Sequence, residues 1–211
     1  MGGWFNKEIN EPNDYNGLKM RMPGLGGRTI KKLGATPVLL AGPDVLPSLS
    51  SGAVDAAEWI CPAADLGAGL YQAAKFYYGP GWHEPSTLLD LSIDLKSWEK
   101  LDKTTQGLID DMTKSFNMTV FSRFQAANGP SLQKLINVHK VKLKKFPDNV
   151  LIALGNAAGE VISERGSINS DTKAICNHLL SFRKNIMDWS TKGESEFARI
   201  RNLPFKYPNS V

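Results

Sequence analysis

A carboxylate and a large aromatic residue stand side by side at Glu58 and Trp59, directly after an apolar run at 52–57. The run predicts a strand, and ligands of α/β proteins bind beyond the carboxyl ends of strands. A carboxylate and a backbone carbonyl suit a hard cation such as Na⁺ or Ca²⁺. The indole could wall a pocket for a small organic molecule. The alternative, which spacing alone favours, is a salt-bridged glutamate beside a core tryptophan.

A second candidate residue, Arg21, also stands at the end of a predicted strand. Leu18, Met20 and Met22 alternate, so Lys19 and Arg21 share the opposite face of this strand. A guanidinium at that position could bind a carboxylate through two parallel hydrogen bonds. The alternative is an ordinary surface arginine.

The triplet Trp82, His83 and Glu84 has residue types that occur in active sites. Successive side chains point in different directions, so the three are not expected to converge without a special turn. An enzyme acting through His83 and Glu84 would need both in one pocket. His139 and His178 lack a carboxylate or cysteine at metal-ligand spacing, so no transition metal is predicted. No hydrolase or kinase motif is present, and the sequence favours a binding protein without catalytic residues.

The first third of the chain alternates between strand and helix patterns. This order predicts parallel strands with right-handed crossovers, as in half of a periplasmic-binding-protein-like sheet, one option among several α/β folds. Glycines end both helices, since they accept a left-handed conformation. The strands are expected at 18–22, 36–40 and 53–59, and the helices at 28–33 and 42–51.

The rest of the chain is predicted to be mainly helical. Gly129-Pro130 should kink or break the longest helix, whose apolar stripe from Leu108 to Phe124 is expected to be buried. A second stripe, Ile175 to Trp189, has the spacing of a helix that lies along a neighbour, such as another subunit. Strands are expected at 75–78, 86–95 and 141–146. Helices are expected at 62–71, 104–138, 147–165 and beyond 170, and a further helix should begin at Ser97 as its cap. Residues 2–8 should form a turn leading into a short amphipathic element, and the tail from Leu203 should be loose.

Composition sets broad limits. The chain has 211 residues, of which 42% are hydrophobic and 22% charged, so it can bury a core as one domain or as two small lobes. The net charge of +4 owes much to a lysine cluster, which we expect to protect a strand edge. Basic residues are not interleaved with aromatic ones, so nucleic acid is not an expected partner. The cluster comprises Lys140, Lys142, Lys144 and Lys145.

Targeting signals are also not found in the sequence. No apolar window is long enough for a membrane span, and the opening residues lack the basic and apolar regions of a signal peptide. Cys61 and Cys176 are far apart and without metal spacing. Free thiols are the expectation, although their redox compartment cannot be read from the sequence.

Several blocks in the first 84 residues together resemble the solute-binding proteins of TRAP (tripartite ATP-independent periplasmic) transporters, in the mannitol/chloroaromatic branch. Members of that branch resemble binders of 2-oxo acids or lactate. The blocks, in the same order as in the family, are Gly2–Phe5, Leu18–Gly27, Leu33–Pro37, Leu49–Trp59 and Tyr77–Glu84.

The resemblance implies a periplasmic receptor that captures a small organic monocarboxylate between two lobes and delivers it to membrane permease subunits. By the family pattern, Arg21 binds the carboxylate, and Trp82 walls the pocket. Glu58, through its side chain, and Trp59, through its carbonyl, hold a Na⁺ or Ca²⁺ ion that bridges to the ligand. The long C-terminal helix would support a homodimer.

The resemblance also implies a partial α/β fold with the N-terminal lobe missing: mixed sheet strands followed by long C-terminal helices. The branch places a cation-binding glutamine just ahead of the Gly2–Phe5 block, where Met1 stands here. Residues 1–56 and roughly 95–150 would lie mostly in one lobe, 57–94 would cross to strands of the other, and 147–203 would form packing and dimerisation helices. The alternative is a truncated structural or dimerising domain that binds no ligand.

Overall fold

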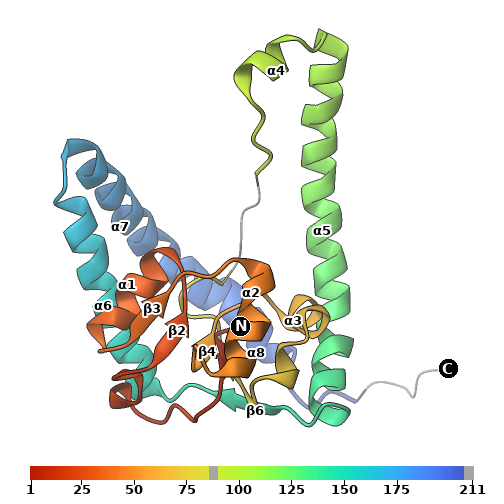
Figure 1. Cartoon of the computed structure of the whole chain (residues 1–211). Coiled ribbons are helices and arrows are strands. Elements are labelled where there is room, and N and C mark those ends of the chain that lie inside the picture. The colour runs from red at the N-terminus through yellow and green to blue at the C-terminus, as the bar shows by residue number, and fades with distance from the viewer. Residues whose placement is uncertain (86–89, 207–211) are drawn as a thin grey trace. The chain divides into compact units, whose positions relative to one another are not determined.

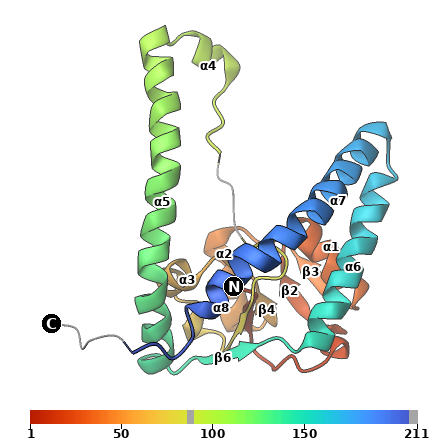
Figure 2. The same cartoon turned by 180° about the vertical axis from the view of Figure 1, so that it is seen from behind.

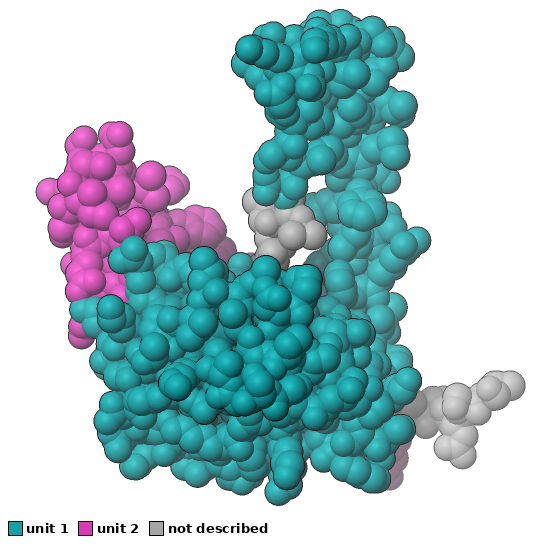
Figure 3. Space-filling view, in the orientation of Figure 1, with its two compact units in different colours: residues 1–158 teal, residues 159–211 magenta. Residues whose placement is uncertain are grey.

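The structure is a computed structural model in which residues 1–85 and 90–206 are described. It divides into two compact units, residues 1–158 and residues 159–211, coloured separately in Figure 3. Each unit is considered by itself. The first contains a sheet, the helices that cover it and a long helix, whereas the regular elements described in the second are helices (Figure 1).

The first unit is built on a six-stranded mixed sheet with the order β3-β2-β4-β1-β5-β6. β2 pairs in parallel with both β3 and β4, whereas β1 is antiparallel to its neighbours β4 and β5, and β6 is parallel to β5. The strands are β1 (Gly3–Phe5), β2 (Lys19–Arg21), β3 (Thr36–Val38), β4 (Ala56–Ala57), β5 (Phe76–Gly79) and β6 (Lys142–Lys145).

Helices connect and cover these strands (Figures 1 and 2). A short 3-10 helix, η1 (Pro12–Tyr15), precedes β2, and another, η2 (Leu70–Gln72), precedes β5. The helices of this unit are α1 (Gly24–Lys32), α2 (Gly42–Ser51), α3 (Pro62–Ala68), α4 (Leu95–Glu99), α5 (Lys103–Asn137) and the first part of α6 (Asp148–Gly166).

The sheet buries a separate apolar cluster on each face, because successive side chains of a strand point to opposite sides. Phe5, Met20 and Tyr78 lie in one cluster with residues from α1 and α6. Trp4 and Tyr77 lie in the other with residues from α2, η2 and the end of α5. Both faces of the central strands are therefore covered by packed side chains, which fixes the positions of the strands and of their ends.

The predicted α/β fold is confirmed, and the parallel strands β2, β3 and β4 lie where the alternation placed them. Helix α2 ends at Gly52, whose φ of 73° is left-handed as predicted. Helix α1 begins at Gly24 rather than at Arg28, so the glycine-rich turn is its first turn. The lysine cluster lies at a sheet edge, since β6 is the last strand.

Strand β1 was missed by the sequence interpretation, which expected a turn there. All three of its residues are buried because it lies between β4 and β5. A strand covered on both faces shows no alternation of polar and apolar residues, so periodicity gives no signal. β4 and β5 belong to this same sheet, so the chain leaves the sheet after Ala57 and returns to it at Phe76.

Two predictions about the region after Trp82 are wrong. The described part of the predicted strand 86–95, residues 90–94, is not a strand, and 86–89 lie outside the described residues. Leu91 is exposed, and a strand needs a hydrogen-bonding neighbour, which residues 90–94 do not have among the described residues. Ser97 is not the cap of α4, since Asp94 precedes that helix and accepts the Ser97 N–H at 3.0 Å.

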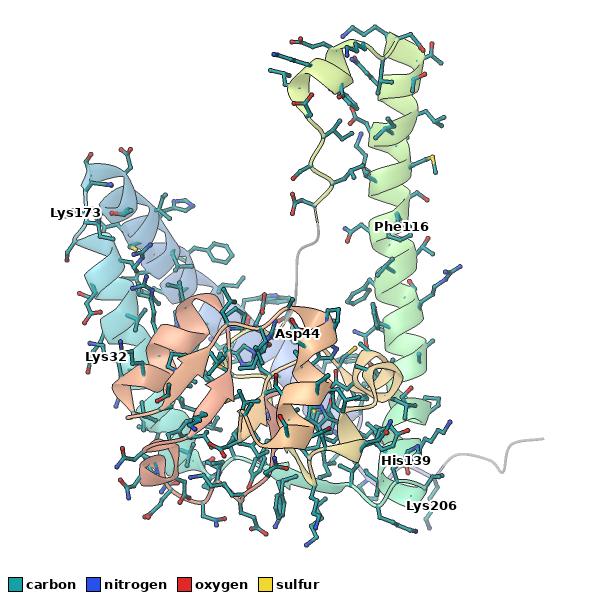
Figure 4. The ribbon with its side chains drawn as sticks, in the orientation of Figure 1. Lys32, Asp44, Phe116, His139, Lys173 and Lys206 are labelled. Atoms are coloured by element: carbon teal, nitrogen blue, oxygen red, sulfur yellow. The ribbon has the colours of Figure 1, made fainter. Side chains whose placement is uncertain are left out.

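Helix α5 also departs from expectation. It runs through Pro130 without a break, and most of its predicted buried stripe is exposed, with Val120 and Phe124 half-buried. Phe116, with 62% of its surface exposed, projects from the stretch of α5 distant from the sheet (Figure 4). Only near its end does α5 enter the core, where Leu135 is fully buried. A proline costs a helix one hydrogen bond and strains the preceding turn, which did not suffice to interrupt this one.

The second unit contains the end of α6, then α7 (Ser170–Ser190), a π-helical turn η3 (Thr191–Ser195) and α8 (Glu196–Ile200). Asn169 caps α7 by accepting the Thr172 N–H at 2.9 Å. The stripe that begins at Ile175 and ends at Trp189 is exposed in the single chain. Residues 203–206 are irregular, and the rest of the predicted loose tail lies outside the described residues.

Two smaller expectations can be compared with the structure. Cys61 and Cys176 are free thiols, as predicted, and both are half-buried. In the described part of the chain, no helix combines the length and the apolarity needed to cross a membrane.

Candidate functional site

Parallel pairing brings Arg21 and Glu58 together at one edge of the sheet. Arg21 is the last residue of β2 and is in register with Ala57 of β4, and the Glu58 N–H donates to the Arg21 carbonyl at 3.0 Å. The carboxyl ends of the two strands thus place a cation and an anion side by side, where α/β proteins commonly bind ligands.

Arg21 forms an ion pair with Glu58 through Nη1 and Oε1. It also donates from Nη1 to the Glu58 backbone carbonyl at 3.2 Å, and from Nε to the Leu40 carbonyl at 3.5 Å. Only 13% of the Arg21 side chain and 6% of the Glu58 side chain are exposed. Such a poorly hydrated pair depends on each partner to compensate the charge of the other.

The Trp59 ring completes this arrangement from the same loop. The guanidinium carbon of Arg21 lies 5.2 Å from the centre of the indole, within the range of a cation–π interaction. The ring packs against the core cluster that contains Trp4. A Cβ added to Gly42, the first residue of α2, would lie 3.1 Å from the Trp59 ring, so the ring lies against the start of that helix.

On its other side, Glu58 contacts His83. Glu58 Oε2 and His83 Nε2 are 3.3 Å apart, and 7% of the histidine side chain is exposed. A pocket of about 310 Å³ opens here, lined by Glu58, His83, Glu84 and the first turn of α1 from Pro23 to Gly26. The pocket therefore has carboxylates and an imidazole facing the N-terminus of a helix.

Burial sets the charges of the basic groups. It lowers the pKa of His83, and the positive charges of the Met1 ammonium and Arg21 lower this pKa further. The Glu84 carboxylate acts in the opposite direction. His83 is therefore neutral near neutral pH. Burial also lowers the pKa of Arg21, with Glu84 acting in the opposite direction. A guanidinium titrates so far above neutrality that Arg21 keeps its charge.

The structure places Trp82 beside the pocket rather than in its lining. The indole packs against the core cluster that contains Phe5, and its ring meets that of His83 edge-on with centroids 5.2 Å apart. Its buried Nε1 has no hydrogen-bond partner among the described residues. Trp82, which was expected to wall the pocket, therefore lies next to it and packs against His83.

As expected, the triplet does not converge as a whole, since Trp82 stays outside the pocket lining, but His83 and Glu84 do come together. Ligand atoms of His83 and Glu84 lie within 4.8 Å of each other and of a Glu58 oxygen. The Gly79–Pro80 bond, just before the triplet, is cis. His83 has its recorded hydrogen bond with Glu58 and not with Glu84, so the pair required for acid–base chemistry is not formed.

Asp65 is a supporting residue that the sequence interpretation did not find. It is 1% exposed and accepts the N–H groups of Ile60 at 3.1 Å and Cys61 at 2.9 Å, and the Trp4 indole N–H at 2.9 Å. The Ile60 N–H belongs to the same peptide unit as the Trp59 carbonyl, and in a trans peptide the two groups point in opposite directions. Asp65 therefore fixes the direction of the Trp59 carbonyl. The sequence offered only the position of Asp65, an acidic residue in the first turn of a helix, and not its burial.

Comparison with known proteins assigns the family. The family described as bacterial extracellular solute-binding protein, family 7, matches residues 1–166. The chain is similar to the monocarboxylate 2-oxoacid-binding periplasmic protein all3028 of Nostoc sp., with 36% identity over 197 residues. That match covers 93% of this chain and 54% of the relative.

Solved structures agree with this assignment. A TRAP periplasmic solute-binding protein from Colwellia psychrerythraea, with bound calcium and pyruvate, is 32% identical with a TM-score of 0.87, covering 94% of this chain and 61% of that one. Another from Pseudoalteromonas atlantica, with bound sodium and pyruvate, is 30% identical with a TM-score of 0.88, covering 98% and 61%.

The chain spans about half the length of the curated relative and about three fifths of these structures. Its mixed sheet with long helices is accordingly a partial form of their fold. With the family match over most of its residues, the chain belongs to the family 7 bacterial extracellular solute-binding proteins, the solute receptors of TRAP transporters.

Proposed function

We propose that this chain carries the carboxylate and cation site of a periplasmic TRAP receptor for a small organic monocarboxylate of the 2-oxo acid or lactate type. The observation that supports this most strongly is the convergence of Arg21, Glu58 and Trp59 at neighbouring strand ends. In this proposal Arg21 binds the ligand carboxylate, and Trp82 supports the wall beside His83.

The donor types at Glu58 and Trp59 fit a Na⁺ or Ca²⁺ ion, because both supply oxygen. Glu58 offers a carboxylate of which one oxygen faces Arg21 and the other His83, and Asp65 fixes the Trp59 carbonyl. Two protein groups cannot fill the six to eight positions of Ca²⁺. Ligand oxygens, water or protein groups beyond these two would supply the rest, and the bound ion would neutralise Glu58 and bridge to the carboxylate.

The Arg21–Glu58 pair suggests how binding proceeds. Arg21 would exchange the Glu58 carboxylate for that of the ligand, and Glu58 would exchange the guanidinium for a cation. Each exchange alone leaves a buried charge uncompensated, at a cost of about 3–5 kcal/mol. Binding of the anion and the cation should therefore be strongly coupled.

A thermal-shift titration with pyruvate and Ca²⁺ tests the proposal on the 211-residue chain. The expected result is a rise in melting temperature with ligand, equivalent to about 2.7 kcal/mol at a hundredfold excess over Kd. Arg21→Met should abolish the shift, and Arg199→Met, which removes an exposed arginine, should preserve it. No shift and no heat of binding with millimolar pyruvate or lactate would favour the alternative, a structural domain that binds no ligand.

The proposed role is binding without turnover. His83 is hydrogen-bonded to Glu58, and the proposal leaves no residue in the role of nucleophile or acid–base catalyst. As in the family, a membrane permease would take the ligand from the receptor in the periplasm. Any conversion of pyruvate by the purified chain, detected by NMR of the ligand, would contradict a purely binding role.

We further propose, from the family arrangement, that residues 1–56 and roughly 95–150 belong mostly to one lobe and 147–203 to packing and dimerisation helices. Within the segment 57–94 the sheet extends to Gly79, so the crossing to the other lobe would lie after that residue.

A second copy of the chain is the partner proposed for the exposed stripe of α7, which includes Phe182 and Trp189. Light scattering checks this, because a homodimer has twice the 23.2 kDa mass of the chain. Phe182→Asp should return the mass to that of a monomer. A monomeric parent chain at high concentration would contradict the dimer.

A further inference from the structure

A second group of metal-ligand atoms lies on the side of Glu58 away from Arg21. It consists of Glu58, His83 and Glu84, whose candidate ligand atoms all lie within 4.8 Å of one another. Glu58 is buried, His83 is largely buried and Glu84 is exposed, so the group leads from the interior to the surface.

We infer that Glu58, His83 and Glu84 form a binding site for a divalent transition-metal ion, with Zn²⁺ or Co²⁺ as the class it fits. An imidazole with two carboxylates suits such ions, whereas Na⁺ and Ca²⁺ take oxygen ligands and gain little from a histidine. This site shares Glu58 with the proposed carboxylate site but does not depend on that function.

The distances fit the inference. With bonds of about 2.1 Å, two ligand atoms on a tetrahedral metal lie about 3.4 Å apart. His83 Nε2 and Glu58 Oε2 are already 3.3 Å apart, and Glu58 Oε1 faces Arg21 instead. Glu58 can therefore offer Oε2 to a metal without giving up its ion pair. Glu84 is exposed, so its side chain is free to move from within 4.8 Å toward the third position.

The hydrogen bonding of His83 is incomplete. Its side chain is 7% exposed, yet its buried Nδ1 has no partner among the described residues. Buried polar atoms are rarely left unpaired, so each exception needs an explanation. If Nε2 bound a metal, the ring proton would reside on Nδ1, and this N–H would still need an acceptor such as water.

The surroundings leave room for the ion and its remaining ligands. The carboxylates of Glu58 and Glu84 are close enough to repel each other, and a divalent cation would relieve that repulsion. The pocket of about 310 Å³ continues to the first turn of α1, from Gly24 to Gly26. Free N–H groups of a helix N-terminus favour anions, so an anionic ligand of the metal would lie on that side.

Titration of the untagged 211-residue chain with Co²⁺, without any carboxylate, tests the inference by visible absorption, and titration with Zn²⁺ tests it by calorimetry. One ion should bind per chain. His83→Ala and Glu84→Gln should each weaken binding at least about tenfold, as loss of a ligand does. The matched controls His178→Ala and Glu99→Gln, which alter an exposed histidine and an exposed carboxylate, should bind as the parent chain does.

The outcomes separate this inference from the proposed function. Affinity unchanged by His83→Ala and Glu84→Gln, loss of binding with His178→Ala, or no Co²⁺ binding at millimolar concentration would overturn the metal site. Arg21→Met should abolish the pyruvate-dependent thermal shift, yet it should bind Co²⁺ at least as tightly as the parent chain, because the metal then compensates the charge of Glu58 that Arg21 no longer does. Since Glu84 is exposed, Glu84→Gln should keep the parent circular dichroism spectrum, so its effect would not reflect unfolding.

Discussion

The core against the sheet of the first unit and the distal part of α5 both carry large apolar side chains but in opposite environments. Phe146 packs against Phe5 and Tyr78 in the core and is 1% exposed. Phe116, on α5, is 62% exposed. Periodicity shows that an apolar face exists, and it does not show whether the chain supplies the surface that covers it. The site lies in the covered region, which explains why the side chains of Arg21 and Glu58 are largely buried.

The largest predicted effect is in the core. Phe146→Ala should lower the free energy of unfolding by about 3–5 kcal/mol, because it removes a buried ring and leaves a cavity. Its ring stacks on Tyr78 with centroids 4.6 Å apart and meets Phe5 edge-on at 6.0 Å. Urea denaturation measures the change. A loss below about 1 kcal/mol would mean that this face of the sheet is not packed as described.

The next largest effect concerns the buried ion pair. Arg21→Met should cost about 3 kcal/mol, since it leaves Glu58 buried with only the His83 contact. Urea denaturation of this variant is compared with that of Arg199→Met, which breaks the exposed pair with Glu196. The exposed substitution should change the stability little. Equal effects of the two substitutions would show that Arg21 and Glu58 are not paired in solution.

A smaller and pH-dependent effect is predicted for Asp65. Burial raises its pKa in the folded chain, although the nearby Tyr77 hydroxyl and the hydrogen bonds from Trp4 and Ile60 oppose this. The folded state then holds the proton more tightly than the unfolded state, so the contribution of Asp65 to stability falls as pH rises through the window from about 4 to the folded pKa.

The comparison that isolates this contribution is between the parent chain and Asp65→Asn, measured by urea denaturation from pH 4 upward. The asparagine cannot ionise, so the stability difference should move in its favour as pH rises. A difference that is independent of pH would show that the pKa of Asp65 is not raised.

The smallest effect should come from the exposed helix. Phe116→Ala should alter the free energy of unfolding by no more than about 0.5 kcal/mol, because the ring has little packing to lose. The same urea experiment that measures Phe146→Ala serves as its reference. A loss comparable with that of Phe146→Ala would mean that another surface covers Phe116 in solution.

The sequence was sufficient to predict the parallel strands and the ends of their helices, because alternation and the glycines at Gly34 and Gly52 are local signals. It was also sufficient to nominate Arg21, Glu58 and Trp59, which parallel pairing then brings together. The roles of these residues stay predictions. Strand β1 and the exposure of α5 could not be predicted, since both depend on which surfaces lie opposite.

The arrangement of His83 shows a second limit. Adjacent residues were expected to diverge, yet His83 and Glu84 both face Glu58, which is remote in sequence. Such convergence depends on how the loop after β5 lies against β4 and α1, a tertiary property without a periodic signal. Asp65 was missed for the same reason, because its partners Trp4 and Ile60 come from different elements.

The most direct test of the account is the coupling between anion and cation binding at Arg21 and Glu58. Pyruvate affinity would be measured by calorimetry with and without saturating Ca²⁺, in the parent chain and in Glu58→Gln. Ca²⁺ should raise the affinity of the parent chain more than tenfold, since about 3 kcal/mol of uncompensated charge exceeds the 1.4 kcal/mol of a tenfold change. Glu58→Gln should show no such increase. Equal pyruvate affinity with and without Ca²⁺ in the parent chain would contradict the account.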